Sequence, residues 1–255
     1  MGIVRLAGMG VAAALGCGQD GPSGGPLLVA TAASVSAAMA ELVTAFEEES
    51  GLRVTETSGA SGQLAQQIRE GAPIDVFLSA DRDWIERLAA EGRIVPGTAA
   101  VYARGVLVLF QAANAETPVA RLTDLTNPGI RRIAIANPES APYGRAARQA
   151  LESAGVLAAV EARIVIAENV RQTVQYVETS GVDVAFTSRA LMEAGSGRWT
   201  VVPADLYDPL EQSLGVMADR PNEAGARAFA EFVLGPRGRE ILSRFGFEPP
   251  EGPGS

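Results

Sequence analysis

The chain of 255 residues is acidic, because 21 Lys and Arg residues stand against 30 Asp and Glu residues, and it contains no histidine. Every basic residue is arginine, and the formal net charge is −9. Nucleic acid is a poor partner for such a chain, since its binding rests on a basic surface. Without lysine and histidine, Schiff-base chemistry, Ser-His-Asp or Cys-His catalysis and His-containing metal sites are excluded.

The N-terminus has the layout of an export signal. Arg5 precedes an apolar run from Leu6 to Gly16 that is too short to span a bilayer, and Cys17 follows it. The residues Ala-Leu-Gly-Cys at 14–17 resemble a bacterial lipobox, whose cysteine becomes the lipidated first residue of the mature protein. An ordinary cleaved signal with an incidental cysteine is the alternative.

We therefore expect residues 1–17 to be an export signal and residues 18–26 a flexible linker. The mature protein would lie in the periplasm or on the outer face of the cytoplasmic membrane. A lipid on Cys17 would be its only attachment to the membrane.

After the linker, segments with strand and helix patterns alternate along the chain. Strands are predicted at Leu27–Thr31, Leu52–Thr57, Ile74–Leu78, Val101–Phe110, Arg132–Ala136, Arg163–Ala167, Val182–Phe186 and Leu214–Ala218. Helices are predicted at Met39–Phe46, Gln63–Glu70, Asp83–Glu91, near Leu122, and at Gly144–Ala154, Val170–Thr179, Glu223–Leu234 and Gly238–Arg244.

Repeated strand–helix units with short loops predict an α/β fold whose sheets are covered by helices. Two runs of such units are joined by the long extended stretch Val101–Phe110. This predicts two lobes, one formed by residues 27–107 with 213–250 and the other by residues 108–212. A ligand cleft is expected between them, since ligands of open α/β sheets bind beyond the carboxyl ends of the strands.

Four loops before predicted helices share small or hydroxyl-bearing residues. They are Thr31–Ser34, Ser58–Gly62, Asn137–Gly144 and Glu168–Val170. Helix starts carry free N–H groups and a partial positive charge, so they bind anions without a formal cation. Each loop taken alone is also explained by ordinary helix capping or turn formation.

Several segments together carry a more specific signal, and they span nearly the whole mature chain. These are Ala32-Ala-Ser34, Ser58–Ile68 (SGASGQLAQQI), Gly71–Asp81 (GAPIDVFLSAD), Ile135–Gly144 (IANPESAPYG) and Ala167–Arg171 (AENVR). In this order they resemble the periplasmic molybdate-binding proteins of ABC transporters.

The resemblance implies a two-lobed, type II periplasmic binding protein fold with mixed, mostly parallel sheets flanked by helices. It implies a monomer without enzymatic activity or cofactor, which closes on molybdate or tungstate and delivers it to the permease of an ABC importer. The molybdenum or tungsten would be held as its oxyanion. Carried over by motif position, the ligand contacts fall on Ser34, Ser61, Tyr143 and Val170.

Two departures from the family pattern matter for the site. Many members take a tyrosine hydroxyl from a later strand, where this chain has Phe186, so Tyr143 of the Pro-Tyr-Gly segment would replace that donor. Ala33 stands where some members have a hydroxyl residue, which leaves the first loop one donor short. We expect Glu139 and Glu168, which lie in or beside these loops, to point away from the anion.

Two other functions are weighed against this one. Sulfate or another tetrahedral oxyanion would suit a donor-only site nearly as well. A Ser or carboxylate enzyme on an α/β scaffold would need a Mg²⁺ cluster such as Asp75, Asp81 and Asp83. Their strand-then-helix context predicts surface and N-cap roles for these aspartates instead.

Overall fold

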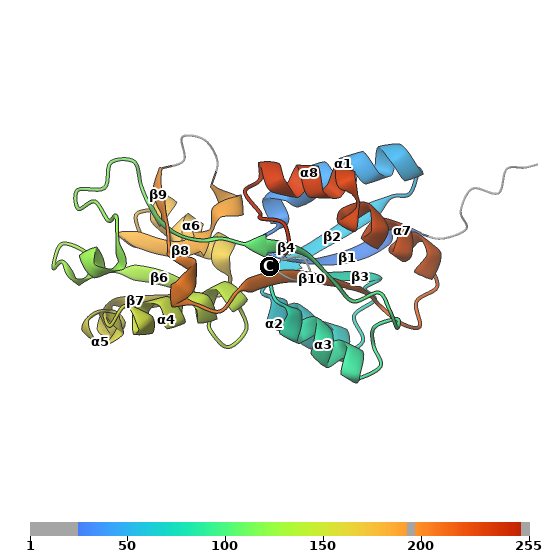
Figure 1. Cartoon of the computed structure of the whole chain (residues 1–255), viewed down its shortest axis with the longest axis horizontal. Coiled ribbons are helices and arrows are strands. Elements are labelled where there is room, and N and C mark those ends of the chain that lie inside the picture. The colour runs from blue at the N-terminus through green and yellow to red at the C-terminus, as the bar shows by residue number, and fades with distance from the viewer. Residues whose placement is uncertain (1–24, 193–196, 251–255) are drawn as a thin grey trace, which may run out of the picture.

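Two five-stranded sheets, one in each lobe, organise the chain in the computed structural model, which describes residues 25–192 and 197–250 (Figure 1). Cys17 and the predicted export signal lie outside the described residues. No helix in the described part of the chain is long and apolar enough to cross a bilayer.

Lobe 1 is built on a sheet with the strand order β2-β1-β3-β10-β4. Its strands are β1 (Leu27–Ala32), β2 (Val54–Gly59), β3 (Val76–Ser79), β4 (Ala100–Gly105) and β10 (Leu210–Val216), and its helices are α1 (Ser36–Ser50), α2 (Ser61–Arg69), α3 (Arg82–Ala90), α7 (Glu223–Leu234) and α8 (Pro236–Arg244). Helices α1, α7 and α8 cover one face and α2 and α3 the other, each over its own hydrophobic cluster (Figure 1). The last two helices thus return to the lobe where the chain begins.

Lobe 2 repeats this plan with the strand order β7-β6-β8-β5-β9. Its strands are β5 (Leu107–Gln111), β6 (Ile133–Ala136), β7 (Ile164–Ala167), β8 (Val184–Ser188) and β9 (Arg198–Val201), and its helices are α4 (Pro142–Ser153), α5 (Leu157–Val160) and α6 (Val170–Glu178). Helix α4 packs on one face of the sheet and α6 on the other.

In each sheet four strands run in one direction and one strand opposes them. In lobe 1 the opposing strand is β10, which pairs antiparallel with both β3 and β4. In lobe 2 it is β5, which pairs antiparallel with β8 and β9. The mixed sheets are as predicted. Their shared strand direction places the carboxyl ends of β1, β2, β6 and β7 at the edges where the lobes meet.

The lobes are joined by the strands that oppose or flank these sheets. The predicted single strand Val101–Phe110 is wrong: β4 ends at Gly105 in one sheet, and β5 begins at Leu107 in the other. Val106 lies between them. The return crossing enters β10 at Leu210, which pairs with Gly105, so this strand begins four residues before the predicted Leu214. The apolar residues run on without a break, so the sequence does not show where the chain leaves one sheet and enters the other.

Other boundaries also differ from prediction. Strand β9 was not predicted, and its residues are mostly exposed at a sheet edge. The helix near Leu122 is a 3₁₀ helix, Leu122–Thr126. Helix α4 begins at Pro142 and not at Gly144, so a glycine that was predicted to start the helix lies in its first turn. A Cβ at Gly144 would lie 2.1 Å from the carbonyl oxygen of Ala136, which explains why glycine is needed there.

Asp75 was predicted to have a surface or N-cap role, and this is wrong because it lies in the interior. Its side chain is 3% exposed, accepts from the backbone N–H of Leu28 at 2.8 Å and pairs with Arg220 at 3.1 Å. A buried carboxylate is tolerated when it is paired and hydrogen-bonded in this way. Asp75 therefore anchors the start of β3 beside β1 and serves the fold of lobe 1.

Candidate anion-binding site

Five segments at or after strand ends meet in one pocket between the lobes. Lobe 1 contributes residues 32–34 at the end of β1, 59–61 at the end of β2, and Ala80 after β3. Lobe 2 contributes residues 141–143 at the start of α4 and 169–170 at the start of α6. The space left between these segments is small, with a cavity volume of about 10 Å³. The structure brings Ser34, Ser61, Tyr143 and Val170 together in the lining of this pocket.

The backbone N–H groups of these four residues form a set of buried donors. Each residue is at most 4% exposed. Among the described residues, none of the four N–H groups has a protein acceptor. Buried backbone donors are nearly always paired, so four unpaired donors lining one pocket indicate a site for an acceptor-rich ligand.

The two serines are not helix caps, which was the simplest structural explanation for them. The N-cap residues of α1 and α2 are Val35 and Ala60, and neither helix has a side-chain cap. The Ser61 hydroxyl oxygen accepts from the backbone N–H of Ala80 at 3.0 Å. Its own proton therefore remains available for a ligand in the pocket.

Tyr143 is the second residue of α4 and is 2% exposed. It was predicted to lie in a loop before the helix, and that prediction is wrong. Its hydroxyl accepts from the Ser188 hydroxyl at 3.1 Å, and Ser34 lies near it in the lining of the pocket. Burial raises the pKa of Tyr143, so the hydroxyl keeps its proton and serves as a neutral donor. Phe186 is 1% exposed in the core of lobe 2 and does not line the pocket.

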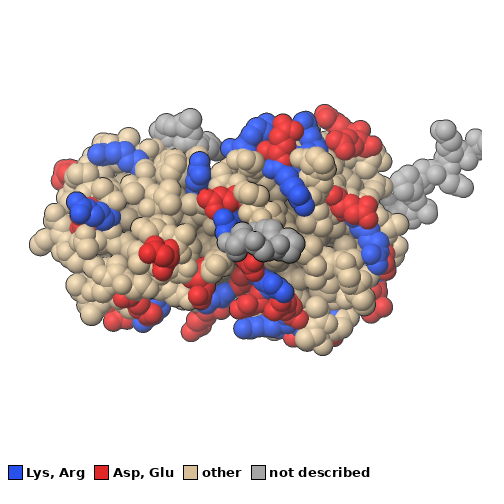
Figure 2. All heavy atoms as spheres, viewed as in Figure 1, with Lys and Arg blue, Asp and Glu red and all other residues tan. Residues whose placement is uncertain are grey.

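No charged side chain lines the pocket in the described part of the chain. Its positive potential comes from the N-termini of α2, α4 and α6, where partial positive charge and free donors coincide. Glu139 and Glu168 are exposed and do not line the pocket. On the face seen in Figure 2, acidic and basic side chains are interspersed over the surface.

The aspartates considered for a Mg²⁺ cluster do not form one. Among the described residues, no group of three or more acidic, histidine or cysteine side chains could hold a metal ion. Asp81 caps α3 as predicted, because its carboxylate accepts from the backbone N–H of Trp84 at 3.3 Å. It is nevertheless buried, at 7% exposed, whereas Asp83 is exposed.

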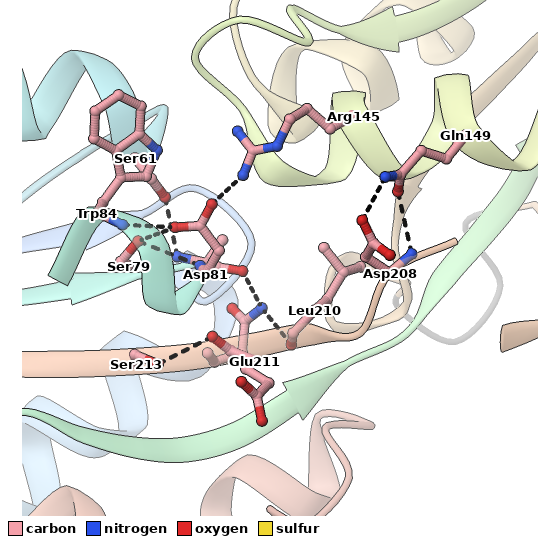
Figure 3. A network of polar contacts seen from close by, with 12 residues as sticks. Ser61, Ser79, Asp81, Trp84, Arg145, Gln149, Asp208, Leu210, Glu211 and Ser213 are labelled. Atoms are coloured by element: carbon pink, nitrogen blue, oxygen red, sulfur yellow. Dashed lines mark hydrogen bonds and ion pairs between the residues drawn. The ribbon is translucent and has the colours of Figure 1, made fainter. Parts of the chain in front are cut away.

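Asp81 also forms an ion pair with Arg145 of α4, which joins lobe 1 to lobe 2 (Figure 3). A second contact between the lobes lies close by, where the backbone N–H of Gly62 donates to the carbonyl of Ser140 at 2.8 Å. A Cβ at Gly62 would lie 2.8 Å from the Trp84 ring and 3.0 Å from Ser140. Glycine at this position therefore allows the two lobes to touch beside the pocket.

Three residues around the pocket were not singled out in the sequence. Ser188 contacts the Tyr143 hydroxyl, Gln212 accepts from the Ser34 hydroxyl at 3.1 Å, and Arg145 pairs with Asp81. Gln212 lies 178 residues from Ser34 in the chain, so no local pattern links them. The one sign of a role for Gln212 in the sequence was its place as a polar residue shortly before the predicted strand Leu214–Ala218.

The fold and the pocket between the lobes define the class of binding proteins that close on a small solute. The pattern of the family described as bacterial extracellular solute-binding protein matches residues 27–248. The chain is 34% identical over 228 residues to the molybdate-binding protein ModA of Rhodobacter capsulatus, covering 88% of each chain. It is 28% identical to a Bacillus subtilis protein named as a putative ABC transporter substrate-binding lipoprotein, YvgL, covering 87% of this chain and 85% of that protein.

Among solved structures, the periplasmic molybdate-binding protein of Azotobacter vinelandii superposes with a TM-score of 0.84 at 33% identity, covering 88% of this chain and all of that one. The chain is thus a bacterial extracellular solute-binding protein of the type II periplasmic fold. It belongs to the ModA family of molybdate-binding proteins.

Burial raises the pKa of Asp81, and Arg145 partly offsets this rise. Replacing Arg145 with methionine leaves a buried carboxylate unpaired when the lobes are closed, so we expect the affinity for oxyanion to fall about tenfold, equivalent to about 1.4 kcal/mol. Since the closed form then favours protonated Asp81, the lost affinity should return as the pH falls.

Isothermal titration of both proteins with molybdate over a range of pH measures this effect. Arg148→Met is the matched control, because Arg148 lies one turn away on α4 and, among the residues that the structure describes, pairs only with Glu152 and Glu161 of its own lobe. An Arg145→Met variant that binds like the control at every pH would show that the ion pair contributes nothing to closure.

Proposed function

We propose that this chain captures molybdate or tungstate outside the cytoplasmic membrane and delivers it to the permease of an ABC importer. The observation that carries the proposal is the set of four buried, unpaired backbone donors lining one pocket, two from each lobe. The membership of the ModA family and the hydroxyls of Ser61 and Tyr143 support it.

The chemistry of the pocket suits a fully deprotonated oxyanion. Its donors are backbone N–H groups and the neutral hydroxyls of Ser61 and Tyr143, and no carboxylate of the described residues lines it to accept the proton of hydrogen phosphate. Such a proton would face other donors, which is the usual basis for rejecting a protonated competitor. Sulfate carries the same charge and geometry as molybdate, so the discrimination between them rests on the size of the closed pocket.

Binding is coupled to closure because the anion contacts both lobes. Ser34 and Ser61 approach it from lobe 1, and Tyr143 and Val170 from lobe 2. Contacts that form only when the lobes are together shift the population to the closed shape. The permease then recognises the loaded protein, which acts as a monomer, by its closed shape.

The ligand preference is tested by thermal unfolding with molybdate, tungstate, sulfate and phosphate. A ligand that binds only the native protein stabilises it by about 4 kcal/mol at about a thousandfold excess over Kd. We expect molybdate and tungstate to raise the melting temperature by several degrees and phosphate to leave it unchanged. A shift with sulfate and none with molybdate or tungstate would replace the proposed ligand by sulfate.

Ser61→Ala tests the site itself. The substitution removes one hydroxyl donor to a charged ligand, so we expect the affinity for molybdate to fall by about 1.5–3 kcal/mol. Ser58→Ala is the control, because Ser58 lies three residues earlier, near the end of β2, and is exposed. Equal affinities of the two variants, measured by titration calorimetry, would remove Ser61 from the site.

We also infer that the mature protein begins at Cys17 and carries a lipid there. The apolar run followed by Ala-Leu-Gly-Cys supports this, as does the lipoprotein name of the Bacillus subtilis relative. Mass spectrometry of the mature N-terminus should find an acylated Cys17. A mature chain that begins elsewhere, or an unmodified cysteine, would leave the protein unanchored.

A further inference from the structure

Gln212 of β10 is a fully buried polar residue behind the anion site. It is 0% exposed and lies where the pairing of β10 with β4 shifts register between Gln212 and Ser213. Such bulges commonly re-aim a side chain beside a functional site. A buried amide in this place has to be held by specific partners.

Both ends of the Gln212 carboxamide are occupied. Its oxygen accepts from the Ser34 hydroxyl at 3.1 Å. Its nitrogen donates to the carbonyl oxygens of Ala80 at 3.0 Å and Leu210 at 3.2 Å. Turning the amide over would set its oxygen against two carbonyl oxygens, so these partners fix the amide with its acceptor toward Ser34.

The same amide is connected to the second serine of the site. The backbone N–H of Ala80 donates to the Ser61 hydroxyl oxygen at 3.0 Å, while its carbonyl accepts from Gln212. Figure 3 shows this group of contacts beside Asp81, with Ser61 on one side and Leu210 on the other. One side chain thus links the two lobe 1 loops that line the pocket.

Gln212 also lies where lobe 2 meets this network. A Cβ at Gly105 would lie 2.9 Å from the Gln212 amide nitrogen and 2.1 Å from the Tyr143 hydroxyl. The amide and the tyrosine hydroxyl therefore approach the same point of β4, at the crossing between the lobes. Because the single proton of Ser34 is given to Gln212, the Ser34 hydroxyl is not a donor to the anion, and Ser34 contributes its backbone N–H.

We propose that Gln212 is a positioning residue of the anion site, which sets the direction of the Ser34 hydroxyl and holds the Ser34 and Ser61 loops at a fixed spacing. This inference rests on the proposed function. The donors of these segments are the backbone N–H groups of Ser34 and Ser61 and the Ser61 hydroxyl. Because they are held in place before the ligand arrives, they do not have to be ordered on binding, which favours affinity. Gln212 itself does not touch the ligand, since it does not line the pocket.

The test uses Gln212→Glu, because the introduced side chain can mimic the amide in only one protonation state. A neutral carboxyl keeps both functions: its carbonyl accepts from Ser34 and its O–H donates to Ala80. An ionised carboxylate has no proton for Ala80 and adds a negative charge behind an anion site. Burial raises the pKa of such a carboxyl, so the change falls within the range that can be measured.

We expect the affinity of Gln212→Glu for molybdate to be near that of the unaltered protein at about pH 6 and at least about tenfold weaker at about pH 9. The unaltered protein and Gln67→Glu, which adds the same charge on the exposed side of α2, should change by less than about twofold over this range. Gln212→Leu, which cannot restore either hydrogen bond, should bind weakly at every pH.

The outcomes separate the two proposals. If the unaltered chain binds none of the tetrahedral oxyanions, the proposed function fails and this inference fails with it. If the unaltered chain binds and Gln212→Glu has the same affinity at all pH values, the role of Gln212 alone is overturned. A loss of affinity that follows only a loss of ligand-free thermal stability would also overturn it, because Gln212 would then serve the fold in general.

Discussion

The pocket has to hold a dianion with backbone dipoles and neutral hydroxyls alone, and this constraint determines much of the architecture. Removing an anion from water requires hydrogen-bond donors that are themselves buried and otherwise unpaired. Helix N-termini supply such donors, but only if the helices start at the cleft. The common direction of four strands in each sheet meets that requirement, since it brings the ends of β1, β2, β6 and β7 to the facing edges of the lobes. The net charge of −9 does not help the protein to hold an anion.

In the part of the chain that the structure describes, charged groups lie beside the pocket and not within it. Asp81 and Arg145 neutralise each other where the lobes touch, and Gly62 lets the backbones of the two lobes approach. A free arginine in the pocket would attract any anion, whereas fixed N–H donors recognise geometry and the absence of a proton. The buried amide of Gln212 lies behind the pocket and is also uncharged. Its hydrogen bonds to Ser34 and Ala80 hold the donor-bearing segments in place without adding charge.

The sequence predicted the α/β class, the mixed sheets and the family, because strand–helix alternation and motifs such as Gly71–Asp81 are local. It also named the four residues that the structure brings together in one pocket, through their places in those motifs. The prediction from the sequence failed where the structure depends on contacts between residues far apart in the chain. The break at Val106 depends on which sheet each half of the run joins, the role of Gln212 depends on a contact 178 residues away, and the burial of Asp75 depends on Arg220.

The most direct test is a crystal structure of the chain with tungstate, whose metal is located by anomalous scattering. We expect one strong peak in the pocket, with the oxygens of the ion within about 2.7–3.2 Å of the backbone nitrogens of Ser34, Ser61, Tyr143 and Val170. A peak held instead by arginine side chains on the surface, with none between the lobes, would contradict this binding mode.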